Sequence, residues 1–134
     1  MTRPSSLPEI IHYWEAKAEE SLAAAHDELQ AGRLTFAVNR LYYACFYLVS
    51  ALLLQQNLKF KKHSGVRAVF HQHLVKTGKI SREMGKFYDE LFEARQRGDY
   101  FEMVFFEPPE VEEWLEKAKL FVAELKELVI NCVN

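Results

Sequence analysis

The chain has 134 residues, of which 49% are hydrophobic and 27% are charged. That length suits one domain with one hydrophobic core, and that composition excludes an intrinsically disordered chain. The net charge of −2 gives the whole molecule no attraction to nucleic acid or anionic lipid, so such binding requires a local basic patch. We therefore predict a single folded domain over residues 1–134, with its core between about residues 8 and 131.

The cysteines and the N-terminal residues point to a reducing compartment. Cys45 lies inside an apolar run, and its separation from Cys132 is not a metal-ligand spacing, so both are expected to be structural thiols. Residues 1–8 contain one arginine and no apolar segment, so we expect neither a signal peptide nor a membrane anchor. These features predict a cytoplasmic location.

The first two predicted elements are long helices. Apolar residues at three- and four-residue steps predict a helix from Leu7 or Pro8 to Ala31, which Gly32 ends. A second helix is expected over Leu34–Gln56, and from Leu41 to Leu54 all its residues except one serine are apolar or aromatic. That run is shorter than the roughly 20 residues that cross a bilayer, so it predicts a buried central helix and no membrane partner.

Three further helices follow in the same pattern of apolar spacing. The third is predicted from His63 or Ser64 to Gly78, the fourth from Ser81 as N-cap to about Gly98, and the fifth from Pro108 onward. No segment alternates with period two, and short connections favour antiparallel neighbours. The sequence therefore predicts an all-α, antiparallel (up-and-down) bundle of four to five helices.

The connection between the last two predicted helices is unusually apolar, because residues 98–107 hold a methionine, a valine and four aromatic residues, Phe106 among them. Two interpretations stand side by side. The connection folds back over the bundle, or it forms part of a subunit interface, since contiguous apolar surface often marks a contact.

The sequence lacks the common catalytic and metal-binding motifs, namely a P-loop, a dinucleotide fingerprint, His-Glu-x-x-His, Cys-x-x-Cys and a nucleophile elbow. His71 and His73 are two residues apart and therefore point to different sides of a helix. We predict no metal site and no cofactor.

Polar residues flank the apolar core at three places: Asn39-Arg40-x-Tyr42-Tyr43-Ala44, Lys62-His63-Ser64-Gly65, and Arg95-x-x-x-Asp99-Tyr100. An asparagine and an arginine at the mouth of a buried helix are costly unless they face a partner or a ligand. In this order and spacing, and with Phe70, the segments resemble a HEPN domain over about Trp14 to Leu128. The resemblance is to small single-domain members, many of them encoded beside a minimal nucleotidyltransferase.

This resemblance implies a homodimer in which the polar ends of the second and fourth helices face a cleft at the interface. The usual activity of the family is metal-independent RNA cleavage, in which an Arg-x4–6-His motif holds the scissile phosphate and moves protons. Arg95 matches the arginine of that motif. Asp99 follows it, and Tyr100 resembles a tyrosine that can accept a nucleotide in such relatives.

The histidine of the motif is absent, because counting on from Arg95 gives Tyr100, Phe101 and Glu102. A tyrosine with a pKa near 10 is a poor proton shuttle at neutral pH, whereas an imidazole near 6.5 is well matched. His63 is the expected substitute. Asn39, Arg40, Tyr43, Lys62 and Ser64 complete the predicted RNA- or nucleotide-binding set.

Each of these residues also has a structural interpretation. Arg95 and Asp99 form an ordinary i,i+4 pair, and Arg40 bridges to a carboxylate of the fourth helix. The tyrosines of the second helix, Tyr43 among them, are core aromatics. The basic stretch from Lys59 to Arg67 is a solvated turn or, if it binds anything, a contact for backbone phosphates.

Two functions of different class remain open, with a third that needs only a protein partner. The first is the HEPN subunit of a toxin–antitoxin pair, a dimeric endoribonuclease neutralised by a minimal nucleotidyltransferase. The second is a non-catalytic module that binds a nucleotide or supports such a partner. The third is a helical bundle without a ligand.

Overall fold

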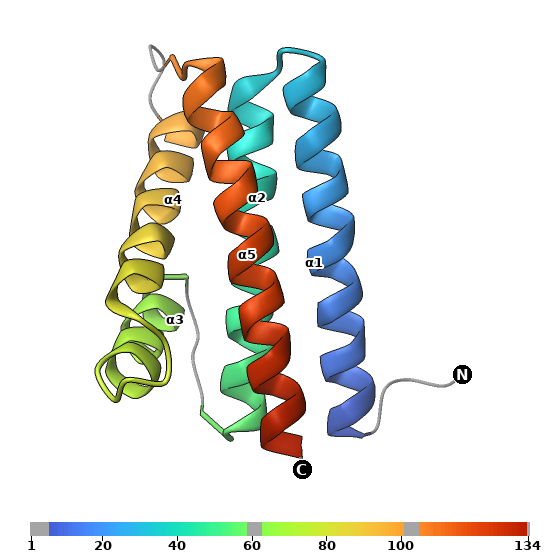
Figure 1. The fold of residues 1–134 in the computed structure, drawn as a ribbon, viewed down its shortest axis with the longest axis vertical. Coiled ribbons are helices and arrows are strands. Elements are labelled where there is room, and N and C mark those ends of the chain that lie inside the picture. The colour runs from blue at the N-terminus through green and yellow to red at the C-terminus, as the bar shows by residue number, and fades with distance from the viewer. Residues whose placement is uncertain (1–5, 59–62, 101–104, 134) are drawn as a thin grey trace.

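The structure is a computed structural model that describes residues 6–58, 63–100 and 105–133. Within these ranges the regular elements are helices: α1 (Leu7–Gln30), α2 (Leu34–Gln55), α3 (His63–Phe70), the π-helical turn η1 (His71–Val75), α4 (Arg82–Tyr100) and α5 (Pro108–Val133). Figure 1 shows that α1, α2, α4 and α5 alternate in direction, with α3 beside α4. The predicted all-α, up-and-down bundle is confirmed.

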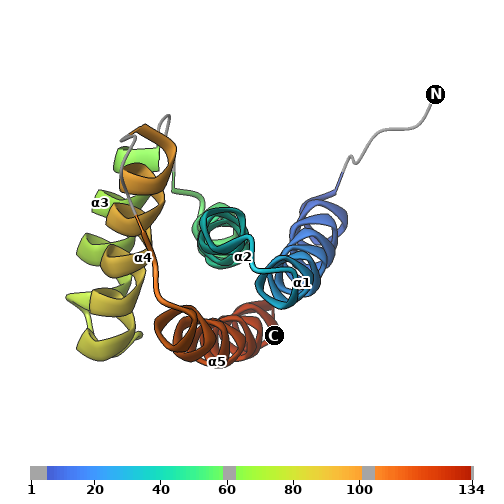
Figure 2. The same cartoon turned by 90° about the horizontal axis from the view of Figure 1, so that it is seen from above.

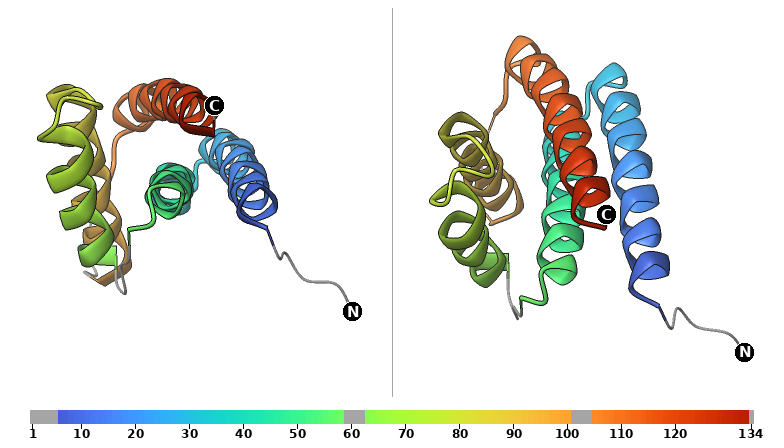
Figure 3. Two further views of the ribbon diagram at one scale, coloured as in Figure 1. Left: turned by 90° about the horizontal axis from the view of Figure 1, so that it is seen from below. Right: turned by 60° about the horizontal axis from the view of Figure 1, so that its bottom comes forward.

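The central helix is α2, as its apolar run predicts. Seen nearly end-on in Figure 2, α2 is surrounded on three sides by α1, α5 and the α3–α4 pair, and the views of Figure 3 agree. By length and composition α2 would also pass as a membrane span, but 67% of that window is buried inside the protein. Its residues on the fourth side, which no described helix covers (Figure 2), are partly buried or exposed.

The caps and turns at the helix ends are formed by serines and glycines, as the sequence predicts. The Ser6 hydroxyl accepts a hydrogen bond from the Glu9 amide at 3.3 Å and caps α1, and the Ser81 hydroxyl caps α4 through the Met84 amide at 3.2 Å. Gly32 has φ +80° and Gly78 has φ +83°, the left-handed conformation that glycine adopts without strain. Gly32 follows the end of α1 as predicted, and Gly78 lies in the turn after η1.

The fourth helix ends at Tyr100, two residues beyond its predicted end at about Gly98. Gly98 serves close packing instead: a Cβ there would lie 3.1 Å from Thr35 Cγ2 and 3.5 Å from the Phe106 ring. Phe106 is buried against Trp114, whereas Phe105 is 82% exposed. The apolar connection thus partly folds back over the bundle, and its residues 101–104 lie outside the described residues.

The third helix also differs from its prediction as one regular helix to Gly78. The α-helix ends at Phe70, and η1 follows with backbone bonds that skip one more residue, such as Lys76 N–H to His71 C=O at 2.8 Å. Phe70 and Leu74 are both fully buried on either side of this change. The wider turn therefore keeps the apolar face of the segment on the core.

Candidate functional site

The side chain at the centre of the candidate site is Tyr42, on the first half of α2. It is fully buried, and its ring lies 5.3–5.9 Å, centroid to centroid, from the rings of Tyr43, Phe46, Tyr88 and Phe92. Aromatic pairs at such distances add to the stability gained from burial alone. Tyr42 thus provides a rigid surface against which polar groups from other helices can be held.

His63 reaches this surface from the first residue of α3. Its Nδ1 lies 2.9 Å from the Tyr42 hydroxyl, and its ring stacks on Phe46 with centroids 4.4 Å apart. Burial, and then the positive charge of Arg95, lower the pKa of His63 below 6.5, so the imidazole is neutral at neutral pH. Burial raises the pKa of Tyr42 to about 12, so its hydroxyl stays protonated.

Arg95 reaches the same ring from α4. Its Cζ lies 4.8 Å from the centroid of Tyr42 and 5.8 Å from that of Tyr43, which is cation–π geometry. Its Nη1 donates to Asp99 Oδ2 at 3.2 Å, the predicted i,i+4 pair. The residue is only 7% exposed, and its Nε is buried with no partner among the described residues. We call Tyr42, His63, Arg95 and Asp99 the Tyr42 cluster.

The other predicted site residues lie at its edge or away from it. Tyr43 packs on both Tyr42 and His63. Asn39 is half-buried, Ser64 is exposed in the first turn of α3, and Arg40 is exposed. Arg40 makes no ion pair with a described residue, so its predicted bridge to α4 is not formed within that part of the chain. Lys62 and the side chain of Tyr100 lie outside the described part.

Sequence reasoning missed a second polar network on the other side of α3. Asp89 on α4 accepts a hydrogen bond from His71 Nε2 at 2.9 Å and lies 3.7 Å from Arg67 Nη1. The Arg67 guanidinium covers the ring of Phe92, 4.0 Å from its centroid. The contact between His71 and Asp89 joins residues 18 positions apart, and no motif in the sequence predicts it.

The Tyr42 cluster can supply two chemical functions. In the tautomer whose Nδ1–H donates to the Tyr42 oxygen, the neutral imidazole of His63 has a free lone pair on Nε2, which suits a general base. A guanidinium can neutralise a phosphate. The cluster is a packed surface, however: two cavities of about 550 and 520 Å³ lie elsewhere on the molecule, and neither Arg95 nor His63 lines them.

Comparison with known proteins shows the family of the chain. A family model described as the HEPN domain matches residues 11–128. The chain is 51% identical over 120 residues to a UPF0332 protein of Thermotoga maritima, which covers 90% of this chain and 91% of that protein. It is 36% identical over 115 residues to the protein named "Putative toxin MJ0142" of Methanocaldococcus jannaschii, covering 86% and 78% of the two chains. The chain belongs to the HEPN domain family.

Proposed function

We propose that this protein is the HEPN subunit of a toxin–antitoxin pair: a cytoplasmic, RNA-directed protein whose partner is a minimal nucleotidyltransferase. The observation that carries the proposal is the meeting of His63 and Arg95 at one tyrosine, although they come from different helices. Two relatives named as putative toxins, each 36% identical to this chain, support the same assignment. In this proposal His63 takes the role of the histidine that the family motif lacks here.

In this proposal, cleavage needs no metal ion. His63 Nε2 accepts the proton of a ribose 2′-hydroxyl, whose oxygen attacks the adjacent phosphorus. The O2′–P bond forms, the P–O5′ bond breaks, and the imidazolium returns its proton to O5′. Arg95 balances the charge of the phosphate during the transfer. The lowered pKa of His63 keeps the imidazole in the basic form at neutral pH.

The surface around the cluster supports a homodimer. The less buried residues of α2 recur at three- and four-residue steps along one stripe, namely Phe36, Arg40, Tyr43 and Tyr47. Phe36 is 61% exposed, which is unusual for a phenylalanine on a central helix. A second copy on this stripe would turn the packed Tyr42 cluster into one wall of a cleft.

One observation favours the second candidate, a non-catalytic module that binds a nucleotide or supports the nucleotidyltransferase. Arg95 is nearly enclosed and is already paired with Asp99, so most of its guanidinium does not face solvent. An arginine held in this way has a structural role: it orients the ring of Tyr42 and pairs with Asp99 in the last turn of α4.

An RNase assay on cellular RNA in the presence of EDTA tests the proposal. We expect cleavage by the wild type and its loss in His63→Ala and in Arg95→Ala, with verified folding. Arg97→Ala and His12→Ala remove exposed residues of the same types and should leave cleavage unchanged. A well-folded wild type that does not cleave, or a His63→Ala protein that does, would contradict the catalytic proposal and favour the module.

The partnership has its own test. The chain is incubated with a co-expressed minimal nucleotidyltransferase and ATP, and its intact mass is measured. We expect a gain of one or more nucleotide units that Tyr100→Phe abolishes and Tyr13→Phe, at an exposed tyrosine of α1, does not. An unchanged mass together with no co-purification would contradict the partnership.

A further inference from the structure

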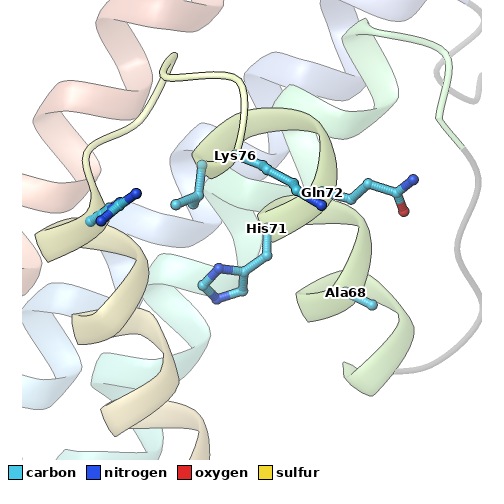
Figure 4. A pocket seen from close by; sticks show the side chains of 6 residues that line it. Ala68, His71, Gln72 and Lys76 are labelled. Atoms are coloured by element: carbon cyan, nitrogen blue, oxygen red, sulfur yellow. The ribbon is translucent and has the colours of Figure 1, made fainter.

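A cavity of about 550 Å³ lies beside η1, at the opposite end of α3 from His63. Its lining comes from α3, η1 and the start of α4: Ala68, His71, Gln72, Val75, Lys76 and Arg82. Figure 4 shows His71, Gln72 and Lys76 leaving one turn of the chain, with Ala68 one turn earlier. We call this space the η1 cavity.

The charges around the η1 cavity are mostly positive, although the chain as a whole carries −2. Residues 71–86 contain four lysines and arginines and a single carboxylate. Lys76 and Arg82 line the cavity from two different elements, and within the described residues neither forms an ion pair. Cations that are not neutralised by the protein attract an anionic ligand.

The remaining polar groups are placed to assist these cations. Asp89 binds His71 through Nε2 at 2.9 Å and also faces Arg67, so its charge is shared between two partners, and it forms no ion pair with Lys76 or Arg82. Gln72 contributes an amide whose NH2 can donate. The cavity therefore offers two charged donors and one neutral donor, which is the chemistry that phosphate oxygens require.

The wall of the cavity is shaped by two special backbone features. The π-helical turn spreads residues 71–75 over a wider loop than an α-helix would, and such turns are frequent at functional sites. Gly85 lets α4 approach closely, because a Cβ there would lie 3.0 Å from both His71 Cε1 and Val75 Cγ2. Any larger residue would require these two lining side chains to shift.

We propose that the η1 cavity is a phosphate-binding site, for the phosphate of a free nucleotide or of an RNA backbone, with Lys76 and Arg82 as its charged ligands. The site is separate from the Tyr42 cluster and goes beyond the proposed function. It requires neither RNA cleavage nor a dimer.

Titration of the ¹⁵N-labelled protein with inorganic phosphate, AMP and a short single-stranded RNA, at constant ionic strength, tests this site. We expect amide shifts in residues 71–82 and their loss in Lys76→Ala/Arg82→Ala, whose affinity should fall roughly tenfold or more. Lys117→Ala/Lys119→Ala removes two exposed lysines of α5 and should bind as the wild type does. Both double variants remove side chains outside the core, so each should remain folded.

The three probes also identify the source of the phosphate. RNA binding that is much tighter than AMP binding, with a steep loss at high salt, indicates backbone phosphates, while equal affinities indicate a single phosphate group. The absence of shifts in the wild type, or the same shifts in Lys76→Ala/Arg82→Ala, would overturn the proposal. Arg95→Ala should bind phosphate at the η1 cavity normally, so failure here is distinct from failure of the ribonuclease proposal.

Discussion

The Tyr42 cluster and the η1 cavity lie at opposite ends of α3 and hold their cations in opposite ways. In the cluster, one guanidinium is nearly enclosed, lies over an aromatic ring and is paired with Asp99. In the cavity, Lys76 and Arg82 face open space, and neither has an ionic partner among the described side chains.

The difference separates two uses of positive charge. A buried cation with an ionic partner contributes to stability and rigidity in addition to any contact it makes with a ligand, and removing it leaves a gap and an unpaired carboxylate. An exposed cation without a partner contributes little to folding and remains available to a ligand. Stability measurements and binding measurements should therefore respond to different residues at the two ends of α3.

The largest expected effect is on stability at the enclosed end. Arg95→Ala should lower the free energy of unfolding by about 2–3 kcal/mol, because it removes a desolvated cation–π contact and a charged hydrogen bond. Arg82→Ala should change it by no more than about 0.5 kcal/mol. Urea unfolding monitored by circular dichroism measures the free energy of unfolding of both variants. Equal losses in the two variants would contradict the distinction between the enclosed and the exposed cation.

A pair of glycines gives effects of opposite sign. Gly85→Ala should cost about 1–2 kcal/mol, because the new Cβ would crowd His71 and Val75. Gly65, in α3 near His63, has nothing within 4 Å of such a Cβ, so Gly65→Ala should stabilise by about 0.5–1 kcal/mol through helix propensity. Thermal unfolding of the two variants measures both changes in stability. A stabilised Gly85→Ala protein would contradict the prediction and show that η1 can move to accommodate the added Cβ.

A smaller effect concerns the bond between Tyr42 and His63. Tyr42→Phe keeps the ring but removes the hydroxyl that lies 2.9 Å from Nδ1, and should cost about 1 kcal/mol. In a double-mutant cycle with His63→Leu the two losses should not add. Additive losses would mean that the tyrosine and the histidine are not energetically coupled.

The smallest effect is on pH dependence. The pKa of His63 is lowered in the folded protein, first by burial and then by Arg95. The unfolded chain therefore binds the proton more readily, so the stability linked to His63 is present above pH 6.5 and is lost as the pH falls below that value. NMR titration should give His63 a pKa below 6.5 that rises in Arg95→Ala. An unchanged pKa in that variant would show that the charge of Arg95 does not act on His63.

The sequence was a good guide to the helices, because their signals are local. Apolar spacing and capping residues located all five, and the glycines with positive φ at 32 and 78 ended two segments as expected. Gly98 lies near the end of α4 but does not itself end the helix, because a glycine has two uses: it ends a helix, or it lets another element approach. Only the positions of Thr35 and Phe106 show which use applies.

The candidate site could be predicted in part. Arg95, Asp99 and His63 stood out as polar residues beside an apolar core, and the structure brings them together. Tyr42 could not be singled out, because its neighbours on α2 are also aromatic and only its complete burial distinguishes it. The η1 cavity was missed because a skipped backbone hydrogen bond leaves no residue signature, and the contact of His71 with Asp89 joins distant parts of the chain.

Because the η1 cavity is built on a π-helical turn, it can change without changing the rest of the fold. Each residue of an α-helix turns the chain by about 100°, so shortening η1 by one residue would swing the position of Lys76 around the helix axis. The short segment 76–81 before α4 would absorb that rotation, leaving the core of α2, α4 and α5 in place. A single-codon insertion or deletion could thus add or remove this site while the bundle, and the chemistry at Tyr42, persist.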